Sequence, residues 1–122
     1  MLSTLSRLFR VRRPAEPVWI ETDALRRQLT ANAAPITVID VREPAEFSSP
    51  PGHLPGAINV PLSTLPTRLG EIAARKQPVV LVCKTDRRSA KAAELLLAQG
   101  VPAVTVLRGG TDGWHNAGLP LE

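Results

Sequence analysis

Short apolar runs and segments with helical spacing alternate along the chain after residue 17, and this alternation sets the expected fold. The apolar runs predict strands at 18–20, 36–41, 57–60 and 79–82, with a further short strand within 101–106. The run Val-Val-Leu-Val at 79–82 is the most hydrophobic of them, which is typical of a buried strand.

Between these runs, apolar residues recur at the steps of a helix. The first predicted helix is capped by Thr22 and has Leu25 and Leu29 one turn apart. Another covers 62–74 and is interrupted at Pro66, and a third covers 89–99 and ends at Gly100. One or two further helical turns are predicted over 111–117. Residues 42–56 are dense in Pro and Gly and predict a loop, with one helical turn at 44–47. Strands that alternate with helices imply an α/β sandwich around a mainly parallel sheet.

Length and composition fit one globular domain. The chain has 122 residues, of which 43% are hydrophobic and 21% charged, so one core of ordinary size is expected. Its single cysteine excludes an intrachain disulfide and favours a reducing compartment. No apolar stretch approaches the roughly 20 residues that cross a bilayer. Because no secretory signal is evident, a cytoplasmic location is expected.

The net charge of +4 lies in an N-terminal leader, residues 1–17. Four arginines precede the first acidic residue, Glu16, and 11 basic and 11 acidic residues follow position 13. This balance argues against a nucleic-acid partner for the body of the chain, 18–122. The leader is expected to be flexible and separate from that domain. Its basic, acid-poor composition also fits an organelle presequence or a weak contact with a membrane surface.

A thiol and a helix start follow the 79–82 strand directly. Cys83 ends the strand, five residues follow, and Ser89 is expected to cap the next helix. Ligands of parallel α/β sheets bind outside the carboxyl ends of the strands. A helix N-terminus at that place favours anions and the nucleophilic thiolate form of a cysteine.

The residues between Cys83 and the predicted helix are mostly cationic. Lys84, Arg87 and Arg88 outnumber Asp86, so the loop is expected to favour an anion. Thiol, helix start and cations together predict attack by sulfur on a small anionic substrate. The competing interpretation is a small buried core cysteine beside a solvated basic surface.

Three groups of motifs lie along the chain in a fixed order. They are IDVREPAEF (39–47) with GHLPGAINVP (52–61), CKTDRRS (83–89), and RGGTDGW (108–114) with AGLP (117–120). In this order, and over residues 18–122, they resemble the single-domain rhodaneses, a family of thiosulfate sulfurtransferases. The resemblance implies a three-layer α/β sandwich with a central, mainly parallel five-stranded sheet flanked by helices.

The resemblance also implies a mechanism. Cys83 attacks the outer sulfur of thiosulfate or a similar anionic donor, a persulfide remains on the cysteine, and cyanide, a thiol or a protein acceptor collects the sulfur. Neither a cofactor nor a metal is implied, and His53 and His115 show no metal-ligand spacing. The loop residues expected to bind the substrate are Lys84, Thr85, Asp86, Arg87, Arg88 and Ser89.

Two further residues of the first motif are expected near the site. Asp40 is expected to be structural, ordering the strand end. Arg42 is expected either to join Asp40 in that role or to help bind the donor.

Two features of the loop bear on the chemistry. Asp86 stands where the family usually has glycine, which keeps open a sulfur carrier or partner-binding module without turnover. Related phosphatases and arsenate reductases carry Cys, five residues and then Arg, whereas here the arginine is the fifth residue, Arg88, and Ser89 is the sixth. The shorter spacing favours sulfur transfer over phosphate chemistry.

Overall fold

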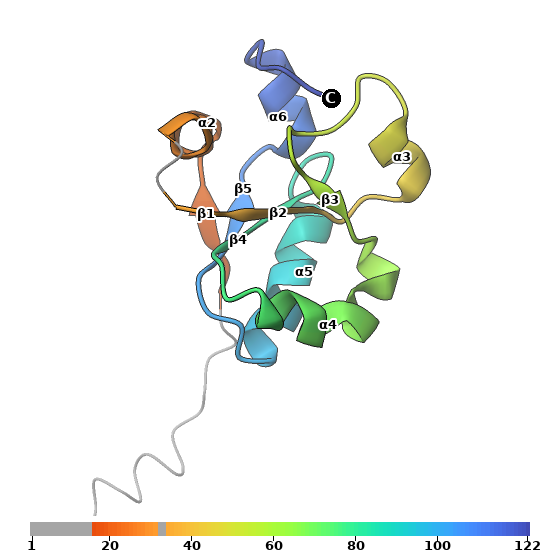
Figure 1. The fold of residues 1–122 in the computed structure, drawn as a ribbon. Helices are drawn as coiled ribbons and strands as arrows, with labels where there is room; N and C mark the ends of the chain where they lie inside the picture. Colours follow the sequence, from red (N-terminus) through yellow and green to blue (C-terminus); the bar gives the residue numbers. More distant parts are fainter. Residues whose placement is uncertain (1–15, 32–33) are drawn as a thin grey trace, which may run out of the picture.

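The hydrophobic run Val79–Val82 forms β4, the middle strand of a five-stranded parallel sheet in the computed structural model (Figure 1). The structure describes residues 16–31 and 34–122. The order across the sheet is β1-β5-β4-β2-β3, and every neighbouring pair is parallel. The other strands are β1 (Val18–Ile20), β2 (Thr37–Asp40), β3 (Ile58–Asn59) and β5 (Val104–Leu107).

Helices cover both faces of this sheet. They are α2 (Thr22–Ala31), α3 (Pro44–Ser48), a 3-10 turn η1 (Leu62–Thr64), α4 (Leu65–Ala74), α5 (Arg87–Ala98) and α6 (Gly110–Asn116). In Figure 1, α4 and α5 lie below the sheet and α2 and α6 lie above it. The three-layer α/β sandwich with a central parallel five-stranded sheet is therefore confirmed.

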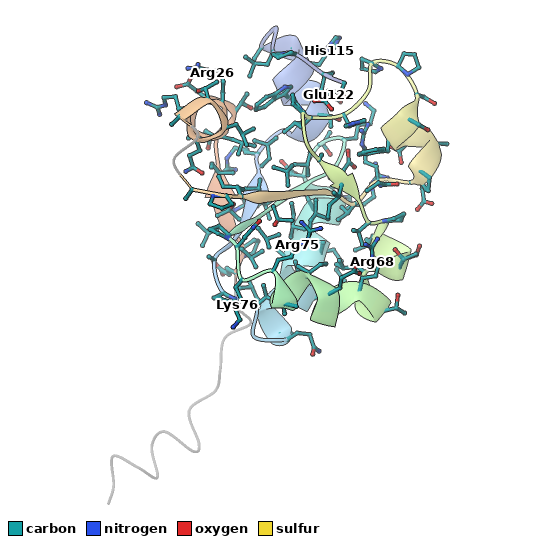
Figure 2. The ribbon with its side chains drawn as sticks, viewed as in Figure 1. Arg26, Arg68, Arg75, Lys76, His115 and Glu122 are labelled. Carbon is teal, nitrogen blue, oxygen red and sulfur yellow. The ribbon has the colours of Figure 1, made fainter. Side chains whose placement is uncertain are left out.

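Alternate residues of β4 supply two cores, one on each face of the sheet. Leu81 packs with Leu65 of α4 and Leu96 of α5 in one cluster. Val80 packs with Leu25 of α2 in the other. Charged side chains such as Arg26 and Lys76 lie at the outside of the molecule, as Figure 2 shows. Since β4 is buried on both faces, its uninterrupted apolar sequence follows from its central position.

Two predicted helix caps are wrong. The first helix already includes Thr22, and the carbonyl of Glu21 accepts its first backbone hydrogen bond. Helix α5 begins at Arg87 with Asp86 as its cap, so Ser89 lies inside its first turn. Asp, Thr and Ser are all favoured at helix starts, which is why residue type alone placed these boundaries incorrectly.

Other predicted boundaries shift by small amounts. The last strand begins at Val104, because Val101, which follows α5, is held to the end of that helix by its N–H, which donates to the carbonyl of Leu96. Gly100, in the left-handed conformation at φ +78°, completes this ending as predicted. Pro66 lies in the first turn of α4 and is preceded by η1, so the interruption falls at that junction.

Residues 1–15 of the predicted leader lie outside the described residues. Within the described ranges, no helix is both long and apolar enough to cross a membrane.

Candidate active site

Cys83 lies immediately after the carboxyl end of β4. The residue is 1% exposed and belongs to the hydrophobic cluster on the α5 side of the sheet. It carries a free thiol. A buried thiol at this edge of a parallel sheet occupies the position where such folds bind ligands.

Ser89 makes the closest polar contacts to the Cys83 sulfur. The N–H of Ser89 donates to Sγ at 3.4 Å, and the Ser89 Oγ lies 3.3 Å from Sγ. Oγ also donates to the carbonyl of Asp86 at 3.2 Å. When the sulfur is a thiolate, this hydroxyl can turn its single proton from that carbonyl to the sulfur. Ser89 thus offers two donors to a charged sulfur.

The start of α6 holds the backbone of the loop between Cys83 and α5. The N–H of Thr111 donates to the Cys83 carbonyl at 2.9 Å, and the N–H of Asp112 donates to the Lys84 carbonyl at 3.0 Å. Gly110 lies so close that a Cβ added to it would overlap the carbonyl oxygens of Cys83, Lys84 and Thr85. Three successive loop carbonyls therefore face α6.

This arrangement fixes the direction of the loop amides. In a trans peptide the N–H points opposite to the C=O, so the N–H groups of Lys84, Thr85 and Asp86 point away from α6. Among the described residues, these amides and the next two, Arg87 and Arg88, donate to no backbone carbonyl. Free N–H groups at a helix start are the elements of an anion-binding cradle.

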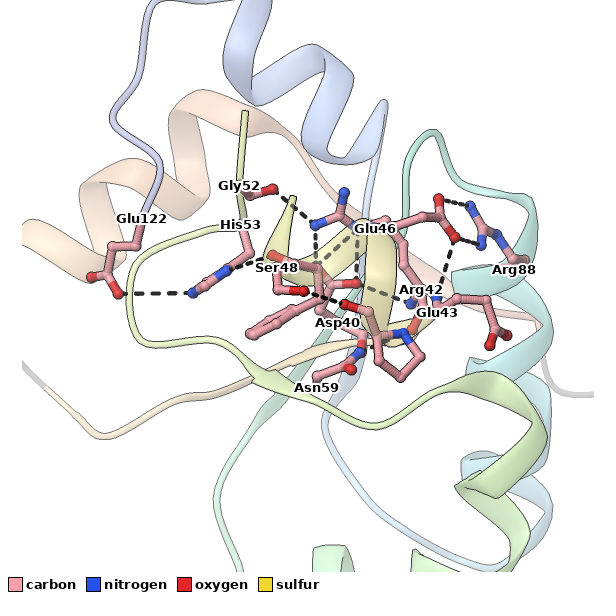
Figure 3. A network of polar contacts seen from close by, with 12 residues as sticks. Asp40, Arg42, Glu43, Glu46, Ser48, Gly52, His53, Asn59, Arg88 and Glu122 are labelled. Carbon is pink, nitrogen blue, oxygen red and sulfur yellow. Dashed lines mark hydrogen bonds and ion pairs between the residues drawn. The ribbon is translucent and has the colours of Figure 1, made fainter. Parts of the chain in front are cut away.

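Two of the three loop cations are bound in ion pairs. Lys84 Nζ lies 2.8 Å from Oδ2 of Asp112. Arg88 binds both carboxylate oxygens of Glu46 of α3, at 2.6 and 3.0 Å, as the dashed lines in Figure 3 show. Carboxylates distant in sequence therefore offset two of the three cations, and the expected preference of the loop for an anion stays a prediction.

The pair between Arg88 and Glu46 is electrostatically strong. The hydrogen bonds from the Arg88 guanidinium lower the pKa of Glu46 from 4.5 to about 2, against the opposing effect of partial burial. The same hydrogen bonds raise the pKa of Arg88. Glu46 is therefore ionised at any physiological pH and compensates the Arg88 charge.

The remaining loop residues lie at the surface. Arg87 is exposed and has no ion-pair partner among the described residues, and Thr85 is exposed as well. Asp86 is half-buried, and its Oδ2 accepts weakly from the N–H of Gly109 at 3.5 Å. Asp86 thus adds a negative charge beside the positive charge of Arg87.

Asp40 and Arg42 form a buried pair at the end of β2. The Arg42 guanidinium donates to both oxygens of Asp40, with its Nη2 at 2.8 Å from Oδ2. The same Nη2 donates to the carbonyl of Gly52 at 2.9 Å (Figure 3). These contacts join the strand end to the segment that follows α3. Donor binding by Arg42 stays a prediction.

The prediction of site residues missed the partners that the fold brings from elsewhere. Glu46 is in the first motif, and Gly110 and Asp112 are in the last, so the motifs themselves carried the signal. Gly109 and Gly110 of this last motif both have positive φ. Their contact with the Cys83 loop depends on β5 lying beside β4, which spacing alone does not reveal.

Comparison with known proteins agrees with this fold and loop. The family model "Rhodanese-like domain" matches residues 21–117. A sulfurtransferase of Allochromatium vinosum is 34% identical over 102 residues, covering 84% of this chain and 92% of that protein. The thiosulfate sulfurtransferase GlpE of Shewanella oneidensis is 34% identical over 85 residues, covering 70% and 81%.

A solved structure gives the same result. The crystal structure of a rhodanese-like domain protein from Staphylococcus aureus is 30% identical, has a TM-score of 0.73, and is matched over 86% of this chain and 98% of that chain. A parallel α/β domain with a cysteine loop after its middle strand is the class that these features define. The chain belongs to the rhodanese-like family, which confirms the resemblance of its motifs.

Proposed function

We propose that this protein is a sulfurtransferase that carries sulfane sulfur as a persulfide on Cys83. The observation that supports this most is that the N–H and the hydroxyl of Ser89 both contact the Cys83 sulfur, beside a loop whose amides donate to no backbone carbonyl among the described residues. Such donors stabilise a negatively charged sulfur and would also stabilise the terminal sulfur of a persulfide. Relatives named sulfurtransferases favour the same activity.

The proposed transfer balances with thiosulfate as the donor. The Cys83 thiolate attacks the outer sulfur, the S–S bond of thiosulfate breaks, and sulfite leaves with the bonding electron pair. The new persulfide keeps one negative charge at the loop amides. A thiol, a protein thiol or cyanide then attacks the terminal sulfur and restores the thiolate. None of these steps needs a redox partner or a metal.

The loop is less suited to phosphoryl transfer. A phosphatase of this fold needs an arginine that is free to bind the oxygens of a phosphate. In this loop, both terminal nitrogens of Arg88 donate to the carboxylate of Glu46. This geometry favours the outer sulfur of a donor over a tetrahedral phosphate.

The proposal is tested by intact mass spectrometry after brief incubation with thiosulfate. The expected result is a species one sulfur atom heavier that disappears on addition of cyanide, and is absent from Cys83→Ser. An adduct that persists with cyanide and with thiols would indicate a carrier without turnover. Phosphate release from an aryl phosphate by the wild type, lost in Cys83→Ser, would instead establish a phosphatase and overturn the proposal.

A further inference from the structure

We infer that Glu46 and Asp112 are specificity-determining residues, and that they adapt the site to sulfur donors with a single negative charge, such as thiosulfonates or persulfides of uncharged thiols. Dianionic thiosulfate is then accepted, but poorly. The inference rests on the proposed sulfurtransferase function and deepens it, because it names the charge class of the donor.

The first basis is the balance of charges around the loop. Its three cations are matched by three carboxylates that come from three different elements of the fold. The cations are Lys84, Arg87 and Arg88, and the carboxylates are Asp86, Asp112 and Glu46. Because the cations and carboxylates around the loop are equal in number, they offer no net electrostatic attraction to the thiosulfate dianion.

The second basis is the geometry of the two ion pairs. Glu46 binds Arg88 with both oxygens, and Asp112 binds Lys84 at 2.8 Å. Bidentate arginine–carboxylate pairs are geometrically specific and hold the guanidinium in place. The lowered pKa of Glu46 keeps this compensation in force down to strongly acidic conditions. Lys84 and Arg88 are therefore engaged by protein carboxylates, whereas Arg87 has no ion-pair partner among the described residues.

The third basis is what remains to bind the donor. The N–H and the hydroxyl of Ser89, at the start of α5, supply partial positive charge at the Cys83 sulfur. Partial charges of a helix start amount to about half an elementary charge. They favour one negative charge on the sulfur that is transferred, and the second charge of thiosulfate meets only the exposed Arg87, whose charge the neighbouring Asp86 offsets.

The test compares two donors that differ by one charge. Thiosulfate is a dianion, and methanethiosulfonate is a monoanion in which a methyl group replaces one oxygen. With methanethiosulfonate, Cys83 attacks the terminal sulfur and methanesulfinate leaves with the electron pair, so the persulfide product is the same. Rates of persulfide formation on the full chain give kcat/KM for each donor.

Glu46→Gln removes the charge while preserving local structure. The Oε1 of Glu46 accepts from the N–H of Glu43 in a capping box at the start of α3, and glutamine serves equally in that position. A unit charge about 6 Å away in a water-like medium changes the rate with a dianion about 10-fold and with a monoanion about 3-fold. The ratio of kcat/KM for thiosulfate to that for methanethiosulfonate should therefore rise about 3-fold.

Asp112→Asn provides an independent variant, since it frees Lys84 from the other side of the loop. We expect the same direction of change, and a steeper loss of thiosulfate activity with added salt in both variants. Glu71→Gln is the matched control, because Glu71 forms an exposed pair with Arg68 on α4 and makes none of the loop contacts. Its donor ratio should equal that of the wild type.

The possible outcomes distinguish failure of the specificity role from failure of the proposed sulfurtransferase function. A donor ratio that stays unchanged in both variants, or that falls, overturns the specificity role while persulfide formation upholds the proposed function. An equal loss of rate with both donors would show that the carboxylates only position the loop, which also overturns it. A wild type that takes sulfur from neither donor overturns the proposed function and this inference with it.

Discussion

Gly110 is the residue on which the shape of the active loop depends most directly. Its φ of +57° lies in the left-handed region, and the carbonyls of Cys83, Lys84 and Thr85 lie where a side chain would start. Glycine adopts this conformation without strain and leaves room for the backbone of the loop. The close approach lets α6 donate its first N–H groups to the loop carbonyls.

We expect Gly110→Ala to abolish or strongly reduce persulfide formation at Cys83. The added methyl group must displace the loop carbonyls, which rotates the opposing amides out of the cradle. Overpacking of this kind also lowers the free energy of unfolding by about 1–3 kcal/mol. Mass spectrometry after incubation with thiosulfate and urea denaturation measure the two effects.

Gly56→Ala is the matched control for that prediction. Gly56 also has a positive φ, +74°, but nothing lies within 4 Å of an added Cβ. It carries the backbone strain without the steric overlap, so persulfide formation should stay at the wild-type level. Equal activity of Gly110→Ala and the wild type would contradict the role given to Gly110.

At the scale of elements, the Glu46–Arg88 pair joins α3 to the first turn of α5. The two residues are 42 positions apart, and no other ion pair among the described residues links these two helices. On the far side of α3, Arg42 and Asp40 hold the chain at Gly52. None of the residues of α3 is buried, so these polar contacts and the stacking of Phe47 on His53 fix the helix and the segment after it.

This linkage predicts a pH dependence of stability. The folded-state pKa of Glu46, about 2, lies below its ordinary value of 4.5. The ion pair therefore stabilises the folded state fully above pH 4.5, and this contribution is lost as the pH falls from 4.5 through about 2. The urea midpoint of the wild type should exceed that of Glu46→Gln near neutral pH, and the two should converge toward pH 2. A difference that stays constant over this range would contradict the assignment.

The elements differ in how far the sequence could predict them. The strand at Val79–Val82 and the helix that ends at Gly100 were predictable, because apolar runs and a left-handed glycine act locally. The cap of α5 was not, since Asp86 and Ser89 are both favoured cap types and residue type does not distinguish them. Local rules therefore predict elements better than their ends.

The candidate site also has one feature that the sequence could predict and one that it could not. Cys83 was predictable, because its position depends on one strand and the helix that follows. The charges of the loop were not, because Glu46 and Asp112 reach it only through the packing of α3 and α6 around the sheet. The prediction used only charges that are adjacent in the sequence, whereas the electrostatics of the site depend on charges that are close in space.

For the whole molecule, the buried residues indicate which part of the chain forms the domain. Among the described residues, the side chains that form both cores come from Ile20 onward, and the family model begins at residue 21. Glu16 and Pro17 precede the first strand and belong to no helix or strand. That the domain folds without the basic leader stays a prediction.

Removal of residues 1–15 is accordingly expected to leave the fold unchanged. The Tm should stay within about 3 °C of the full chain, since a change of roughly 1 kcal/mol in a domain of this size shifts Tm by several degrees. Leu25→Ala is the positive control, because Leu25 is fully buried and its truncation costs about 2–5 kcal/mol. A decrease in Tm as large as that of Leu25→Ala would show that the leader packs against the domain, and the two would then have to be treated as one folding unit.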